Sequence, residues 1–62
     1  MTYVELVELI AATTGKFSLS YEGTGYLIEF IEAEDCTTVA TGVIRSGGYI
    51  ERRNETTLFV QL

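Results

Sequence analysis

Reactive side chains are few in this chain, and none has a partner at catalytic spacing. Catalysis needs a nucleophile, acid or base beside a group that shifts its pKa, and the 62 residues include no histidine and one cysteine. Glu34 and Asp35 directly precede Cys36, and neighbouring carboxylates raise the pKa of a thiol. Ser46 precedes two glycines, but nothing in the chain resembles a base for it. We predict a non-enzymatic protein with no catalytic residues and no cofactor.

Carboxylates gather around one predicted turn, at Glu29, Glu32, Glu34 and Asp35. Oxygen ligands at this density could bind Ca²⁺ or Mg²⁺. Their spacing does not match the EF-hand loop, which also requires a glycine. The sequence therefore favours a solvated acidic turn over a metal site.

The basic and aromatic side chains form one small group in the sequence, Arg45, Arg52 and Arg53 with Tyr49. Such a group can bind a small anion or a carboxylate, but it is too small for general nucleic-acid binding. The formal net charge of −5 also works against phosphates and anionic membrane surfaces. The same charge attracts a basic protein, for example one that binds nucleic acid.

Length and composition predict a single small globular domain over residues 1–62. No apolar run approaches the 18 residues of a membrane span. The first ten residues carry Glu5 and Glu8 and no basic stretch, so we expect no secretion signal. The lone cysteine fits a reducing compartment, and we expect the protein to be cytoplasmic.

A helix is predicted over residues 3–13. Thr2 and Glu5 have the spacing of a capping box, and Gly15 follows as a natural end. Apolar residues recur at i, i+3, i+4 and i+7, which is the period of one helix face: Tyr3, Leu6, Val7 and Ile10.

The rest of the chain reads as strands and tight turns. Strands are predicted over residues 17–22, 26–32, 37–45, 49–53 and 57–62, separated by loops rich in glycine or polar residues. Short loops make consecutive strands antiparallel. The expected fold is α+β, with one N-terminal helix packed on an antiparallel meander of four to five strands.

The loop lengths also predict registers, with Phe30 opposite Val39 and Ile44 opposite Ile50. These pairings sort the sheet into two faces. We expect the helix to cover the face with the small residues Ala40 and Gly42, where a helix can approach the backbone. That face carries Leu27, Ile31, Ala40, Gly42, Ile44, Ile50 and Phe59.

A single helix leaves the second face of this sheet uncovered, and an exposed apolar face usually marks an interface. The expected anchors on it are Tyr26, Ile28, Phe30, Val43 and Tyr49. The acidic residues Glu32, Glu34 and Asp35 would steer a basic partner. We therefore predict a small acidic interaction module that acts as a homodimer or docks on a protein partner, without binding nucleic acid or membrane directly.

The general plan of a tiny acidic helix-plus-meander protein is similar to that of phage and mobile-element accessory proteins, including inhibitors of host defence. The resemblance rests on no motif. It implies one specific version of the prediction, an inhibitor of nucleic-acid-binding machinery. The alternative is a small-ligand or anion-binding module, with a pocket between subunits lined by tyrosines and arginines.

Overall fold

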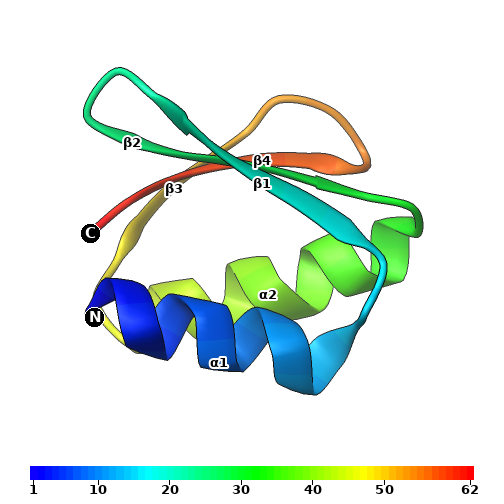
Figure 1. Ribbon diagram of the computed structural model, residues 1–62, viewed down its shortest axis with the longest axis horizontal. Helices are drawn as coiled ribbons and strands as arrows, with labels where there is room; N and C mark the ends of the chain where they lie inside the picture. Colours follow the sequence, from blue (N-terminus) through cyan, green and yellow to red (C-terminus); the bar gives the residue numbers. More distant parts are fainter.

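The computed structural model describes all of residues 1–62 and has two layers, a four-stranded sheet lying over two helices (Figure 1). All neighbouring strands are antiparallel, in the order β1-β2-β4-β3. This confirms the predicted α+β class, with an N-terminal helix on an antiparallel sheet. The elements in chain order are α1 (Tyr3–Thr13), β1 (Phe17–Glu22), β2 (Gly25–Phe30), α2 (Ala33–Arg45), β3 (Tyr49–Arg52) and β4 (Thr57–Gln61).

Helix α1 has the predicted bounds and the predicted cap. The Glu5 backbone N–H donates to Thr2 Oγ1 at 3.2 Å, and the Thr2 backbone N–H donates to Glu5 Oε1 at 2.8 Å. These two bonds satisfy two of the N–H groups that a helix start leaves without a partner. Because the carboxylate accepts from Thr2, the pKa of Glu5 lies below its ordinary value of 4.5.

The capping box gives a pH-dependent prediction. Thr2→Ala should lower the free energy of unfolding by about 1 kcal/mol at pH 7. A lowered folded-state pKa means that the carboxylate stabilises the fold above pH 4.5 and loses this effect as pH falls through that lowered pKa. The melting temperature of wild type should exceed that of Glu5→Gln at pH 7, and the difference should shrink below pH 4. A difference that stays constant from pH 7 to pH 3 would contradict a role for the ionised carboxylate.

The prediction of a strand over residues 37–45 is wrong, because these residues form most of helix α2. The β-branched residues suggested a strand, yet this helix accommodates them. The hydroxyls of Thr37, Thr38 and Thr41 donate to the backbone carbonyls four residues earlier, a bond that helical threonines commonly make. The buried residues of α2 fall at i, i+3, i+4 and i+7, the helical period: Cys36, Val39, Ala40 and Val43.

The predicted faces of the sheet are therefore inverted for β2 and β4, whereas β3 has the predicted faces, with Ile50 against the core and Tyr49 away from the helices. Both helices pack against the face that carries Ile28, Phe30, Leu58 and Val60, all of which are buried. Leu27, predicted to lie under the helix, instead pairs with Phe59 on the side away from the helices. The predicted registers required residues 37–45 to be a strand, and the true neighbour of β2 is β4.

The two halves of the chain repeat one plan, a helix followed by two strands. A shift of 32 residues carries Leu27 onto Phe59, and these two residues are direct cross-strand partners at the centre of the sheet. The edge strands depart from this symmetry. Phe17 pairs with Phe30, but Tyr49 pairs with Gln61 rather than with Leu62. Because a slip of one residue reverses the side-chain faces, Phe17 faces the helices and Tyr49 faces the opposite side.

Candidate interaction surface

The structure gathers no group of three or more His, Cys, Asp or Glu side chains suited to a metal ion. Cys36 is a free, fully buried thiol in the core. Burial raises the pKa of Cys36, and the nearby Arg52 guanidinium opposes this only in part. The thiol is therefore held in its protonated form inside the helix–sheet layer.

Three of the predicted anchors are core residues. Ile28 and Val43 are completely buried and Phe30 is 5% exposed, so none of them offers a surface to a partner. The prediction places them on an outer face because it treats residues 37–45 as a strand. Tyr26 and Tyr49 do reach the surface, but they lie apart. Tyr26 is half-buried on the helix side of β2, and Tyr49 is exposed on the far side of the edge strand β3.

The predicted acidic residues lie together at one end of the molecule. Glu32 is the N-cap residue of α2, and Glu34 and Asp35 lie in its first turn, where negative charge offsets the helix dipole. The loop before β4 lies against this end, because Arg52 Nη2 bonds both Ala33 O (3.3 Å) and Glu55 O (2.7 Å). In Figure 1 the start of α2 and the β3–β4 loop appear at the same end. None of these carboxylates takes part in an ion pair.

Arg52 joins the start of α2 to the β3–β4 loop. Besides the two bonds above, it donates to Thr37 Oγ1 at 2.8 Å and to Asn54 O at 3.3 Å. The guanidinium therefore links the β3–β4 segment to the first turns of α2, two parts of the chain that are distant in sequence. This role was not foreseen from the sequence, which placed Arg52 in an anion-binding group.

Arg52→Met should lower the free energy of unfolding by about 1–2 kcal/mol, because it keeps the apolar stem but removes the hydrogen bonds to three backbone carbonyls, those of Ala33, Asn54 and Glu55. The matched control is Arg45→Met, at an exposed position in the last turn of α2, where a change within about 0.5 kcal/mol is expected. Urea unfolding followed by circular dichroism measures both. Equal effects of the two substitutions would contradict the linking role of Arg52.

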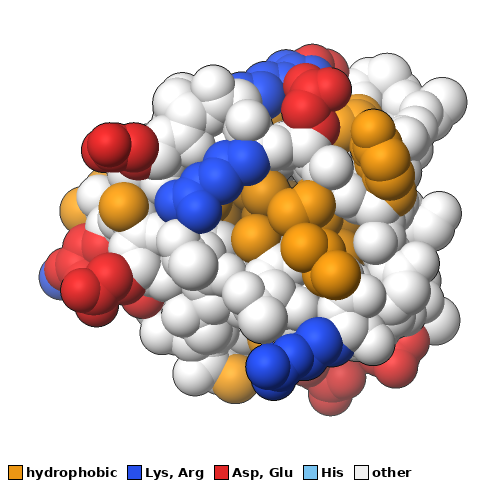
Figure 2. Space-filling view, turned by 180° about the vertical axis from the view of Figure 1, so that it is seen from behind, with side chains coloured by type: hydrophobic (Ala, Val, Ile, Leu, Met, Phe, Trp, Pro, Cys, Tyr) orange, Lys and Arg blue, Asp and Glu red, His pale blue; other side chains and the backbone are white.

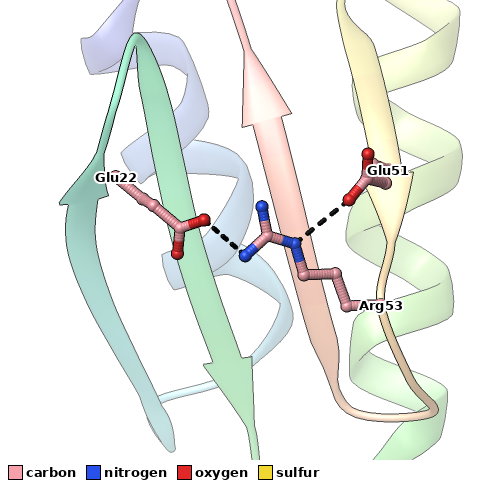
Figure 3. A network of polar contacts seen from close by, with 3 residues as sticks. All are labelled: Glu22, Glu51 and Arg53. Atoms are coloured by element: carbon pink, nitrogen blue, oxygen red, sulfur yellow. Dashed lines mark hydrogen bonds and ion pairs between the residues drawn. The ribbon is translucent and has the colours of Figure 1, made fainter.

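The side of the sheet away from the helices is mostly polar, contrary to the predicted apolar second face. The Arg53 guanidinium lies on this side of the sheet between two carboxylates (Figure 3). Its Nη1 is 2.5 Å from Glu22 Oε1, and its Nε is 3.1 Å from Glu51 Oε1. These two carboxylates raise the pKa of Arg53. The same guanidinium lies over the ring of Phe59, 5.0 Å from its centroid, and so shields part of the apolar surface. This side therefore does not present a large apolar patch.

Three tyrosines meet where α1 begins and the β1–β2 hairpin ends. The Tyr26 ring lies 5.2 Å from the Tyr3 ring and 4.8 Å from the Tyr21 ring. The Tyr21 and Tyr26 hydroxyls are 3.2 Å apart, and their hydrogen bond is the main cause of the raised pKa of Tyr26. Tyr21 is 77% exposed and Tyr3 46%. The sequence singled out Tyr26 alone, because the contact joins three separate elements.

Helix α1 continues this apolar surface along its outer side. Leu9 packs against Gly42 of α2, where a Cβ would lie 2.7 Å from Leu9 Cδ2. At 3.6 residues per turn, the opposite side of α1 carries Tyr3, Val4, Val7 and Ala11. Val7 is half-buried and the other three are exposed.

Strand β1 is an open edge of the sheet beside this stripe. Phe30 N–H donates to Thr56 O. The backbone N–H and C=O groups of every second residue of β2, counted back from Phe30, therefore point toward β4. Those of the residues between, including Glu29, point toward β1. The partners of the latter in β1 are Ser18, Ser20 and Glu22. The backbone N–H and C=O groups of the remaining β1 residues therefore point to the open edge: Phe17, Leu19 and Tyr21.

We call this side of the molecule the α1–β1 surface, made of Tyr3, Val4, Val7, Ala11, Phe17, Leu19, Tyr21 and Tyr26. No member carries a charge at neutral pH. The opposite side, formed by α2 and β3, exposes Thr37, Thr41 and Arg52 together with the apolar side chains of Ile44 and Tyr49. Figure 2, seen from behind, shows Lys and Arg side chains above, beside and below the hydrophobic side chains near its middle.

One open depression of about 620 Å³ lies where β1 begins and β2 ends. Lys16 and Glu29 place opposite charges at it, and Ile31 contributes an exposed apolar side chain. None of the arginines or tyrosines expected to line a ligand pocket belongs to it.

Comparison with protein-family models, with curated proteins and with solved structures gave no match. Neither helix is long and apolar enough to span a membrane.

Proposed function

We propose that this chain is a non-enzymatic interaction module that binds a protein partner through the α1–β1 surface. The observation that carries the proposal is the combination of an uncharged apolar helix side with an open strand edge beside it. Unprotected edges pair readily with another strand, and natural proteins usually block them with charges, prolines or short strands. Strand β1 has six residues, and its only charged residue, Glu22, lies at its end.

The tyrosine cluster supplies the anchors of this surface. Tyrosine offers a large contact area with few rotatable bonds, and it is enriched among residues that dominate binding energy. Tyr21 and Tyr3 are exposed and already held by Tyr26. Little side-chain entropy is then lost when a partner covers them.

The acidic residues at the start of α2 indicate the charge that a partner should carry. Glu32, Glu34 and Asp35 are not neutralised by ion pairs, so they attract a basic protein and speed its encounter. A nucleic-acid-binding protein is one partner of this kind, and masking its groove would make the chain an inhibitor. We propose the cytoplasm as the location, since the single free thiol suits a reducing compartment.

Two exposed tyrosines at opposite edges of the sheet allow a matched test. Tyr21 lies on the α1–β1 surface and is 77% exposed, while Tyr49 lies on β3 and is 64% exposed. Immobilised wild type, Tyr21→Ser and Tyr49→Ser would be compared for the proteins that they retain, including added free copies of the chain itself.

We expect at least one protein to be retained by immobilised wild type and by Tyr49→Ser but not by Tyr21→Ser. If that protein is basic, its affinity should fall as salt rises from low to physiological concentration. Retention of the same proteins by all three forms would argue against the α1–β1 surface as the binding site. Loss with Tyr49→Ser alone would move the site to β3.

A further inference from the structure

We propose that the α1–β1 surface takes a second copy of this chain, with the two β1 strands paired antiparallel about a two-fold axis at Leu19. This rests on the proposed function in placing a partner at that surface, and it adds that this partner is a second copy bound in a defined register. The acidic residues Glu32, Glu34 and Asp35 lie outside the paired strands and stay free to attract a basic protein to the dimer. The product is a continuous eight-stranded sheet with the two α1 helices side by side beneath its centre.

The backbone of β1 is prepared for this pairing. Its outward N–H and C=O groups belong to Phe17, Leu19 and Tyr21, as derived above from the β2–β4 bond. Antiparallel strands exchange hydrogen bonds between directly opposed residues at every second position. A two-fold axis at Leu19 opposes Leu19 to itself and Phe17 to Tyr21, so every outward group of β1 gains a partner.

The side chains are self-complementary in the same register. Ser18 lies opposite Ser20 of the second copy, and the aromatic rings of Phe17 and Tyr21 meet on the helix side of the sheet. Lys16 lies opposite Glu22 of the second copy, on the other side, which gives two pairs of opposite charge per dimer. Glu22 uses one carboxylate oxygen for Arg53, and its second oxygen remains for this lysine.

Helix α1 lies beside β1 and carries its uncharged stripe on the same side of the molecule. Glu5 is turned away from this stripe by the helical period, whereas Glu8, four residues after Val4 and three before Ala11, borders it. The stripes of two copies can therefore meet at Tyr3, Val7 and Ala11, with Glu8 at the margin of the contact. The two-fold operation makes the contact isologous, the commonest arrangement in protein dimers.

The other sheet edge does not offer this complementarity. Strand β3 has four residues, includes Glu51 and Arg52, and is followed by Arg53. Short strands and charges are the usual protection of an edge. The side of α2 that carries the exposed Ile44 also carries Thr37 and Thr41, which are exposed hydroxyl residues, so it does not present the continuous apolar stripe seen on α1.

Mixed cysteine variants test the register. Ser18 and Ser20 would be directly opposed across the axis in a pair without hydrogen bonds, where Cα atoms lie about 4.5 Å apart, close enough for a disulfide. Under a mild oxidant such as oxidised glutathione, a mixture of Ser18→Cys and Ser20→Cys should form covalent dimers at least tenfold faster than either variant alone. Cys36 is fully buried and can stay in place.

Charge exchange provides the second readout. Lys16→Glu and Glu22→Lys should each weaken dimerisation roughly tenfold in sedimentation equilibrium, because each opposes like charges twice per dimer. The double variant should regain most of the wild-type affinity. Equal cross-linking by mixed and single cysteine variants, or a double variant weaker than both singles, would overturn the register.

The two proposals fail in different ways. A wild-type chain that stays monomeric at millimolar concentration would overturn self-pairing. Proteins retained by wild type and lost with Tyr21→Ser would still support the α1–β1 surface as a binding site. Both proposals would be contradicted by a monomeric chain whose retained proteins are the same in the Tyr21→Ser variant.

Discussion

Ile28→Ala should lower the free energy of unfolding by about 3 kcal/mol, within the usual range for a large aliphatic side chain removed from a core. Ile28 is completely buried at the centre of the helix–sheet layer, in the same cluster as Leu6 and Val39. A domain of this size has a total stability of only about 3–5 kcal/mol. The variant would keep about 0–2 kcal/mol, so we expect it to be partly unfolded at 37 °C.

The adjacent residue provides the control. Leu27 lies on the opposite side of the sheet and is only half-buried, so Leu27→Ala should cost about 1 kcal/mol. Urea unfolding monitored by circular dichroism gives both values. The comparison tests which side of the sheet faces the core. A larger loss of stability in Leu27→Ala than in Ile28→Ala would place Leu27 under the helices.

Gly25→Ala should destabilise the fold by about 2–3 kcal/mol, although it adds only one methyl group. A Cβ at this position would lie 2.5 Å from Phe59 Cζ and 2.6 Å from the carbonyl oxygen of Val60. The ring is held beneath Arg53 and the carbonyl belongs to a central strand. Neither can move without disturbing the β2–β4 pairing.

Gly15→Ala is the matched control, because nothing lies within 4 Å of the Cβ that it would gain. That substitution should be neutral or stabilising by up to about 1 kcal/mol, since alanine restricts the unfolded chain. Thermal unfolding of the two variants under one buffer condition measures the contrast. Equal melting temperatures would contradict the close approach of β4 to Gly25.

Local signals in the sequence predicted the elements whose stability is local. The capping box of Thr2 and Glu5 and the apolar period of residues 3–13 located α1 correctly, because every group involved lies within one or two turns. The loop at Gly23 was also predicted. Its φ of +59° and the pairing of Glu22 with Gly25 show a two-residue hairpin turn of the kind that glycine permits.

The error at α2 shows where local propensity fails. Threonine and valine suggested a strand, but the tertiary environment favoured the helix that buries Cys36, Val39 and Val43 against the sheet. The buried residues recur at the helical period, but the many β-branched residues of this segment favoured the prediction of a strand. Because strand registers depend on which segments are strands, this one error reversed the side-chain faces assigned to β2 and β4.

The candidate surface was visible from the sequence only in part. Tyr26 was selected for its exposure on a sheet, and it does belong to the tyrosine cluster. Tyr3 and Tyr21 were missed, because their contact with Tyr26 depends on how α1 crosses the β1–β2 hairpin. An open edge is likewise a property of strand order, which loop lengths alone do not determine.

Amide hydrogen exchange, measured residue by residue by NMR at low and high protein concentration, tests the pairing of β1 most directly. The N–H groups of Phe17, Leu19 and Tyr21 should exchange rapidly in dilute solution and become protected as concentration rises. The N–H groups of Ile50 and Arg52 are the control. The Arg53 N–H bonds Thr57 O, so the backbone N–H groups of Ile50 and Arg52 point away from β4. They should exchange rapidly at both concentrations. Exchange at Phe17, Leu19 and Tyr21 that does not change with concentration would contradict the pairing of two β1 strands.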